Sequence, residues 1–248
     1  MNIVKFLLKL LLIIFTFGIF ILVLLIFTVK YQGENALSGL VGNSVLKSEF
    51  LIKSFNLNKP GDFRYVYMFD QSNEINVNIY YSDDSSPSGE IQDWVGKMVE
   101  STLKKHTRIN EVSLDYKDVK DGYEDEDLIG LRNKLAKNSS IPELNIIYLT
   151  KYSPSPEYLG ITLSRDTIFI FKGGFESINE NTKIMARIEE STIMHEWGHL
   201  LGVAHVEDEN CIMSEAVHFY SNRKLYLSEV PIEYCAEELS QIRAMIGI

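Results

Sequence analysis

Cysteine is scarce in this sequence: Cys211 and Cys235 are the only two among 248 residues. A zinc site made of four cysteines is therefore excluded. If the two cysteines form a disulfide, it closes a loop of about 25 residues and stabilises the fold by roughly a few kcal/mol. Such a bridge is expected in an oxidising compartment, and the alternative is a pair of buried free thiols.

Positive charge is scarce as well. The chain has 24 Lys and Arg against 34 Asp and Glu. Lys5, Lys9 and Lys30 lie in an N-terminal stretch without acidic residues, so the remainder has 21 basic against 34 acidic residues and a formal charge of −13. A surface this acidic argues against nucleic acid or anionic lipid as a partner.

Charged residues are absent from 10–29, which is a continuous apolar run. Twenty residues of α-helix measure about 30 Å, the thickness of a hydrocarbon core. The run predicts a transmembrane signal-anchor, although a cleaved secretory signal has the same polarity around a shorter apolar centre. Lys5 and Lys9 are expected to stay in the cytoplasm. The rest of the chain would then lie outside the cell membrane, or be secreted if the signal is cleaved.

This interpretation divides the chain into four segments. Residues 1–9 form a short cytoplasmic segment, 10–29 the transmembrane helix and 30–61 a juxtamembrane stalk with a short helix expected over 45–54. Residues 62–248 are long enough for one domain with its own hydrophobic core.

Histidine is also rare, yet three of the five histidines fall within HEWGHLLGVAH, residues 195–205. His195 and His199 are four residues apart, which places both imidazoles on one face of a helix. Gly202 can end that helix in a left-handed conformation, so that His205 returns to the same metal ion. Three neutral imidazoles with an open fourth position are the ligands of a catalytic zinc ion. The alternative is a polar helix whose histidines are incidental.

The pattern H-E-x-x-H-x-x-G-x-x-H followed by a methionine turn resembles the signature of the metzincin zinc peptidases. By this resemblance Met213, eight residues after His205, forms an apolar floor beneath the metal. Zinc lowers the pKa of its bound water and polarises the substrate carbonyl. Glu196 is the only carboxylate fixed by the motif, and it is expected to act as the general acid/base.

The resemblance reaches the metzincin clan but no single family. Val206 follows the third histidine and Glu215 lies two residues after Met213, and these two positions match none of the astacins, reprolysins, serralysins or many matrix metalloproteinases. Archaemetzincins and matrixin-like peptidases match in part; the Cys211-x-Met pattern resembles the former. No cysteine precedes His195, so the cysteine-switch latency of matrix metalloproteinases is not available.

The spacing of apolar residues predicts an α/β (α+β) domain. Helices are expected at 90–106, 183–201 and 236–246, and strands at 75–81, 112–116, 141–150, 158–163 and 167–171. The order is similar to that of metzincins, which have a five-stranded mixed sheet, a backing helix, an active-site helix, and a small C-terminal subdomain with the Met-turn and a closing helix. By the same resemblance the fourth strand is antiparallel at the sheet edge and binds extended peptide by strand addition, with a protected hairpin as the alternative.

Other candidate contacts rest on the same resemblance. Substrate contacts are expected at Leu159, Gly160 and Ile161 of the edge strand and at Tyr220 after the Met-turn. The acidic residues 118–127 are a weak candidate for Ca²⁺, because their spacing fails the EF-hand pattern and suits a solvated loop.

The sequence thus predicts a membrane-anchored, extracytoplasmic zinc peptidase that acts on a peptide or protein, with endopeptidase activity as the leading form. Three alternatives are an aminopeptidase of the archaemetzincin type, a latent enzyme, and a zinc-dependent peptide-binding module without turnover. The intact Glu196 argues against the last alternative, since a domain that only binds has no use for a base.

Overall fold

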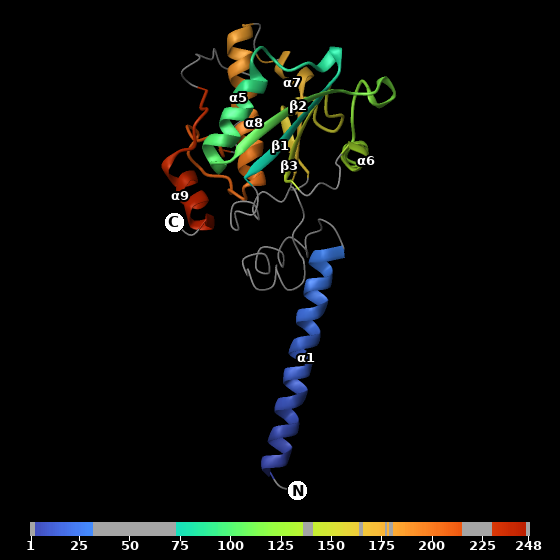
Figure 1. The fold of residues 1–248 in the computed structure, drawn as a ribbon, viewed down its shortest axis with the longest axis vertical. Helices are drawn as coiled ribbons and strands as arrows, with labels where there is room; N and C mark the ends of the chain where they lie inside the picture. The colour runs from blue at the N-terminus through green and yellow to red at the C-terminus, as the bar shows by residue number, and fades with distance from the viewer. Residues whose placement is uncertain are drawn as a thin grey trace. The chain divides into compact units, whose positions relative to one another are not determined.

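The structure of the protein is a computed structural model that describes residues 3–31, 73–135, 141–163, 166–176, 178, 181–214 and 230–246. By its internal contacts the chain divides into two units, Met1–Lys59 and Pro60–Ile248. Helix α1 (Ile3–Tyr31) is the described part of the first unit, and every other described element belongs to the second (Figure 1). The four expected segments stay predictions, and the helix expected at 45–54 lies outside the described residues.

Helix α1 extends beyond the uncharged run 10–29 at both ends. Its stretch Lys9–Ile26 is long and apolar enough to cross a membrane, a property that signal sequences near an N-terminus share. The hydroxyl of Thr16 donates to the carbonyl of Leu12 at 2.9 Å within the helix. A hydroxyl bonded in this way leaves no unpaired polar group on an apolar surface.

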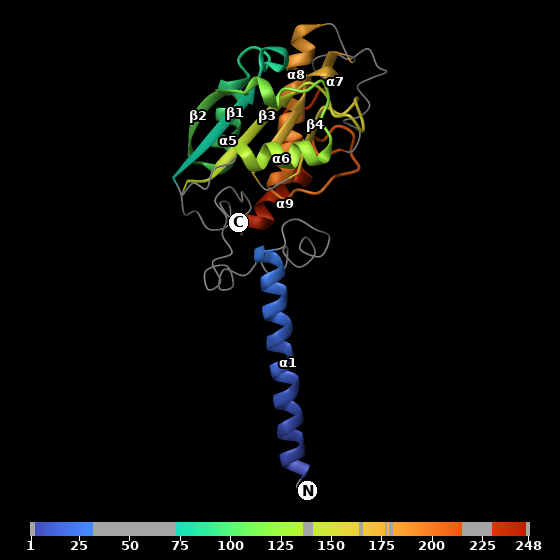
Figure 2. The same cartoon turned by 90° about the vertical axis from the view of Figure 1, so that its right-hand side faces the viewer.

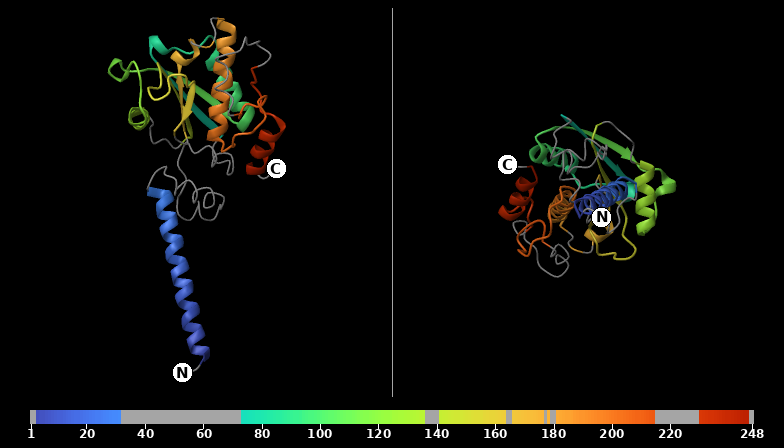
Figure 3. Two further views of the ribbon diagram at one scale, coloured as in Figure 1. Left: turned by 180° about the vertical axis from the view of Figure 1, so that it is seen from behind. Right: turned by 90° about the horizontal axis from the view of Figure 1, so that it is seen from below.

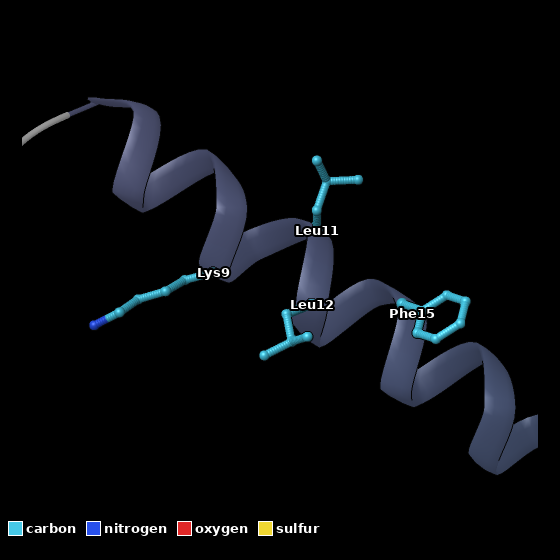
Figure 4. Close-up of a pocket in the computed structure, with 4 residues that line it drawn as sticks. All are labelled: Lys9, Leu11, Leu12 and Phe15. Carbon is cyan, nitrogen blue, oxygen red and sulfur yellow. The ribbon is translucent and has the colours of Figure 1, made fainter.

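Figure 4 shows four side chains on the surface of α1 that border a hollow formed by this helix alone: Lys9, Leu11, Leu12 and Phe15. Three of the four are apolar and exposed. The hollow is therefore part of the apolar surface of the helix, and no set of polar groups converges on it.

A five-stranded sheet forms the centre of the second unit, with the order β2-β1-β3-β5-β4. Its strands are β1 (Glu74–Tyr81), β2 (His106–Ser113), β3 (Glu143–Leu149), β4 (Gly160–Thr162) and β5 (Thr167–Phe171). All neighbours pair in parallel except β4, which runs antiparallel to β5 at the end of the sheet. The predicted mixed sheet of five strands with an antiparallel fourth strand at its edge is confirmed.

Helices cover both faces of this sheet (Figures 1 and 2). On one face, α5 (Ile91–Leu103) and α8 (Thr182–Leu200) pack on alternate strand residues such as Ile146. On the other face, α6 (Asp125–Leu135) packs on the intervening residues, such as Ile147. The central strand β3 is therefore buried on both faces, as its apolar sequence predicts.

The boundary between the first helix of the domain and the second strand differs from the prediction. The helix expected at 90–106 ends at Leu103, and the strand expected at 112–116 occupies His106–Ser113. Lys104 ends the helix in a left-handed conformation, with φ 57°, and its backbone N–H donates to the carbonyl of Glu100. A left-handed C-cap is usually a glycine or asparagine, so the lysine at this position did not indicate the end of the helix.

Helix α6 was not predicted, because its first residues belong to the acidic stretch 118–127 that suggested a loop. Asp125, Glu126 and Asp127 instead form the first turn of a helix. Carboxylates are stabilising there because the exposed N–H groups make a helix N-terminus partially positive. A short helix, α7 (Lys172–Glu176), was also missed.

The helix that carries the histidines, α8, lies within one residue of its predicted span 183–201. The side-chain oxygen of Asn181 accepts hydrogen bonds from the backbone N–H groups of Lys183 and Ile184 and so caps its first turn. The closing helix α9 (Ala236–Ile246) begins and ends as predicted. It lies beside α8 in both views of Figure 3, and its Ile242 is part of the same core.

Candidate metal centre

Three imidazoles meet at the C-terminal end of α8. The Nε2 atoms of His195 and His199 are 3.1 Å apart, and the Nε2 atom of His205 lies 3.3 Å from the first and 3.1 Å from the second. A tetrahedral zinc ion with bonds of about 2.0–2.1 Å requires its ligands to be about 3.3 Å apart. The three nitrogens therefore have a spacing that one metal ion can bridge.

The ring of His195 is oriented by the backbone. Its Nδ1 lies 2.7 Å from the carbonyl oxygen of Ile212, and both groups are buried. Because a carbonyl only accepts, Nδ1 must carry the proton, which leaves the lone pair of Nε2 free to bind a metal. A backbone carbonyl that fixes the tautomer of a histidine in this way is a common partner of metal ligands.

The pKa of His199 also favours metal binding. Burial, together with the neighbouring His195 and His205, lowers the pKa of His199 to about 3. The His199 imidazole is therefore neutral near pH 7, which is the form that binds a metal.

Gly202 brings the third histidine to the site. Its φ is 79°, in the left-handed region that a glycine adopts without strain. The backbone N–H groups of Gly202 and Val203 donate to the carbonyls of His199 and Gly198 at 2.9 Å each, which closes the end of α8. The chain then reverses, and His205 reaches the two helical histidines.

Met213 lies directly beneath this end of the helix. A Cβ added to Gly198 would be 2.2 Å from the Sδ atom and 3.1 Å from the Cε atom of Met213. Only a glycine at position 198 allows so close an approach, since both distances are shorter than ordinary van der Waals contacts. The loop returns through Val206, whose N–H donates to the carbonyl of Met213 at 3.0 Å.

The loop before Met213 is fastened to the start of α9. Cys211 and Cys235 form a disulfide, as predicted. The carboxylate of Glu238 is fully buried and accepts hydrogen bonds from the backbone N–H of Met213 and, at 2.7 Å, from that of Cys235. Cys211, Cys235 and Glu238 are close enough to resemble a metal site, but the disulfide uses both sulfurs.

Glu196 lies one residue after the first histidine and is buried against the edge strand. The hydroxyl of Thr162 donates to its Oε2 atom at 2.8 Å. Burial raises the pKa of Glu196 to about 7, and the hydrogen bonds from the side chain and backbone of Thr162 act in the opposite direction. A carboxyl with this pKa can both take and release a proton near neutral pH.

The residues expected to contact substrate do not lie together. Leu159 and Ile161 pack into the two hydrophobic cores on opposite faces of the sheet, whereas Gly160 lies against α8 beside Glu196. Tyr220 lies outside the described residues.

The acidic stretch 118–127 gives the calcium hypothesis no support. The carboxylates of Asp118 and Asp127 form ion pairs with Lys134 and Lys120, respectively. In the parts of the chain that the structure describes, no acidic side chains of this stretch form a group of three that could bind one ion.

Sequence reasoning missed three residues that shape the site: Thr162, Gly198 and Glu238. Glu238 had a usable signal, because a glutamate three residues after a helix cap often bonds to the cap N–H. Gly198 lies inside the histidine motif, where a glycine in a helix indicates a close packing contact. Thr162 had no local signal, since its partner is 34 residues away.

The described elements thus define an α/β domain with a mixed sheet and a three-histidine cluster at the end of one helix. No family model and no curated protein matches the sequence. Among solved structures, the archaemetzincin from Methanopyrus kandleri is similar with a TM-score of 0.52 and 12% identity, over 73% of this chain and 100% of that chain. At this identity the likeness shows that the two share a fold.

Two further solved structures are less similar. The archaemetzincin from Archaeoglobus fulgidus complexed with malonate has a TM-score of 0.44 and 14% identity, over 68% of this chain and 99% of that chain. A zinc-dependent peptidase from Methanocorpusculum labreanum has a TM-score of 0.46 and 13% identity, over 67% of this chain and 99% of that chain. With TM-scores below 0.5, neither adds to the argument on the fold.

Proposed function

We propose that the protein is a zinc-dependent peptidase in which His195, His199 and His205 hold one Zn²⁺ ion and Glu196 transfers the proton. The single observation that carries the proposal is the meeting of three imidazole Nε2 atoms within 3.1–3.3 Å of one another, next to a buried glutamate. Imidazole nitrogens suit zinc, whereas Ca²⁺ and Mg²⁺ prefer oxygen ligands.

The chemistry then divides between the ion and the chain. When bound, zinc lowers the pKa of a water ligand and polarises a carbonyl oxygen. Glu196, whose pKa is about 7 without the metal, would accept a proton at a carboxylate oxygen and pass it to the departing amine. The Ile212 carbonyl holds His195 in the tautomer that leaves Nε2 free, and Met213 fills the space beneath the helix end.

We infer that the substrate is an extended peptide that pairs with β4. The support is that β4 is the last strand of the described sheet and that Gly160 and Thr162 adjoin Glu196. An unpaired strand edge beside a cleft is a template for a peptide backbone. An acidic domain of this kind is not expected to bind nucleic acid.

We further propose that the protein belongs to the metzincin clan. The histidine motif, Met213 and a fold shared with the M. kandleri archaemetzincin support this assignment. Val206 departs from the residues that distinguish metzincin families; it is a buried residue that hydrogen-bonds to the Met-turn through its backbone. Val206 therefore does not assign the protein to one family within the clan.

We also propose that α1 anchors the domain outside the cell membrane. The apolar stretch Lys9–Ile26 and the disulfide between Cys211 and Cys235 support this location, because disulfides persist in oxidising compartments. Alkylation of the native chain, with and without reduction, should give masses that differ by two alkyl groups. Equal masses would contradict the disulfide and, with it, the proposed location.

The function is tested with the full-length chain in detergent. We expect one zinc per chain, cleavage of a mixed peptide library, and loss of both with His205→Ala. His106→Ala is the matched control, since this histidine is exposed on β2, outside the cluster. Peptides with blocked and free N-termini separate an endopeptidase from an aminopeptidase. A chain that binds zinc but cleaves nothing would indicate a binding module and contradict the proposal.

A further inference from the structure

The edge strand and the proposed proton-transfer residue are joined by one side chain, that of Thr162. Its hydroxyl lies 2.8 Å from the Oε2 atom of Glu196 and 3.2 Å from the backbone carbonyl oxygen of the same residue. A hydroxyl has a single proton to donate, and the shorter contact to the charged group is the stronger bond. Thr162 therefore fixes which carboxylate oxygen of Glu196 faces the strand.

The backbone of Thr162 faces away from β5. Phe171 N–H donates to the carbonyl of Leu159 at 2.9 Å, and these two residues are in register across β4 and β5. In an antiparallel pair, hydrogen-bonded and non-hydrogen-bonded positions alternate. Ile161 is then the next hydrogen-bonded position, and the N–H and C=O groups of Gly160 and Thr162 point away from β5. A backbone hydrogen bond of Thr162 also reaches the Glu196 carboxylate.

Gly160 reveals how tightly β4 and α8 approach each other. A Cβ at this position would lie 2.8 Å from the Cγ2 atom of Thr192, 3.0 Å from the Cγ atom of Glu196 and 3.1 Å from its Oε1 atom. Gly160 and Thr162 are two residues apart, so they face α8 together. Gly160 leaves room for the Glu196 carboxylate because it has no side chain. The Thr162 hydroxyl then bonds to that carboxylate.

We propose that Thr162 is a positioning residue for Glu196, so that the edge strand proposed to pair with a peptide also orients the proton-transfer carboxylate. With Oε2 held by the hydroxyl, Oε1 is the oxygen that takes and releases the proton. This inference rests on the proposed function, because Glu196 must be the group that moves the proton. The edge strand was expected to act through its backbone, by pairing with the peptide. The inference adds a role for the side chain of Thr162.

The kinetic test compares Thr162→Val, which has the same shape without the hydroxyl, with Thr162→Ser, which keeps it. In the zinc-loaded, full-length chain, Thr162→Val should lower kcat about tenfold, keep KM within twofold and keep one zinc per chain. Thr162→Ser should restore kcat to within about threefold of wild type. An unchanged kcat in Thr162→Val, a loss confined to KM, or an equal loss in Thr162→Ser would overturn the proposal.

Thr107 offers a matched control on the opposite edge of the sheet. Its hydroxyl donates to Glu100 at 3.1 Å, so Thr107→Val removes the same kind of hydrogen bond at a position in β2. This variant should keep the wild-type kcat. If it lowers kcat as much as Thr162→Val does, the effect comes from general destabilisation and the proposal is wrong.

A second measurement uses the metal-free chain and does not depend on activity. Thr162→Val should raise the unfolding equilibrium constant about fivefold at pH 8 when Glu196 is present, and by less than about twofold in a Glu196→Ala background. Equal effects in both backgrounds would overturn the contact. If the wild-type chain cleaves no peptide, the proposed function fails. The comparison of Thr162→Val in the two backgrounds still decides whether Thr162 holds Glu196.

Discussion

Helix α8 carries two buried glutamates, two turns apart on one face, with different surroundings. Glu189 is fully buried and accepts hydrogen bonds from Ser88 N–H at 3.1 Å, Ser88 Oγ at 2.6 Å, Tyr148 OH at 2.9 Å and Lys172 Nζ at 2.7 Å. Glu196 accepts one side-chain hydrogen bond, from Thr162. Lys172 also gives Glu189 a positive partner, whereas burial raises the pKa of Glu196 to about 7.

The difference separates a structural carboxylate from the one proposed to transfer the proton. A carboxylate whose acceptor sites are filled by donors and whose charge is neutralised is fixed in place by its partners. A buried carboxylate with fewer donors binds a proton at a higher pH and remains able to release it. The N-terminal half of α8 is therefore held in place by Glu189, and the C-terminal half carries Glu196, the proposed proton-transfer residue.

The largest expected effect on stability comes from removing the structural carboxylate. Glu189→Ala should lower the free energy of unfolding by about 3–5 kcal/mol, because it removes a fully buried carboxylate and leaves the partly buried Lys172 ammonium without its negative partner. Urea unfolding of the full-length chain measures this loss. Glu190→Ala is the control; the Glu190 carboxylate is 3.7 Å from the Arg187 guanidinium and partly exposed, so its loss should cost less than about 1 kcal/mol. Similar losses in both variants would contradict the comparison.

The pH dependence of stability should identify Glu196 in the metal-free chain. Its pKa rises from 4.5 to about 7 on folding, so the stability that it contributes is present below pH 4.5 and is lost as the pH rises through 7. Wild type should therefore lose up to about 3 kcal/mol relative to Glu196→Gln between pH 4.5 and 8.

His199 changes stability with pH in the opposite direction, but it does not alter the stability difference between wild type and Glu196→Gln. Its pKa falls from 6.5 to about 3 on folding, so its contribution is present above pH 6.5 and is lost as the pH falls toward 3. This contribution is the same in wild type and in Glu196→Gln. Parallel stability curves for the two proteins would show that Glu196 has no raised pKa.

A smaller effect is expected where Met213 passes beneath the reactive half of α8. Gly198→Ala puts a methyl group 2.2 Å from the Met213 Sδ atom, and the loop must shift to admit it. Overpacking of this kind costs about 1–3 kcal/mol. The shift should also weaken zinc binding, measured by competition with a chelating dye. Unchanged zinc affinity would indicate that Met213 is not a support of the metal centre.

The smallest effect is expected at Ser191, which lies between the two glutamates. Its hydroxyl is buried and has no hydrogen-bond partner among the residues that the structure describes. Ser191→Ala should therefore leave stability unchanged or raise it by up to about 1 kcal/mol. A thermal unfolding curve shifted clearly downward would indicate that the hydroxyl has a structural partner.

The elements with strong local patterns could be predicted from the sequence. The histidine spacing located α8 and Gly202, and alternating or continuous apolar residues located β1, β3 and β5. The acidic start of α6 failed as a signal because the same residues suit a loop and a helix N-terminus. The start of β2 failed because the turn before it depends on Lys104 rather than on a glycine.

The surroundings of the two glutamates could not be predicted in this way. Glu189 meets Ser88, Tyr148 and Lys172, which come from three separate segments of the chain. Only the packing of the sheet against α8 brings these groups together, and a single sequence contains no pattern for it. The same is true of Thr162, whose strand has three residues and therefore almost no periodicity.

Peptide turnover by zinc-loaded Glu196→Gln, compared with Glu189→Gln and wild type under conditions where all three are folded, tests the central claim most directly. We expect Glu196→Gln to bind one zinc per chain and to lose about 10²–10⁴-fold in kcat, because glutamine cannot transfer the proton. Glu189→Gln should lose stability but keep kcat within about tenfold of wild type. Wild-type turnover by zinc-loaded Glu196→Gln would contradict the assignment of the reactive carboxylate.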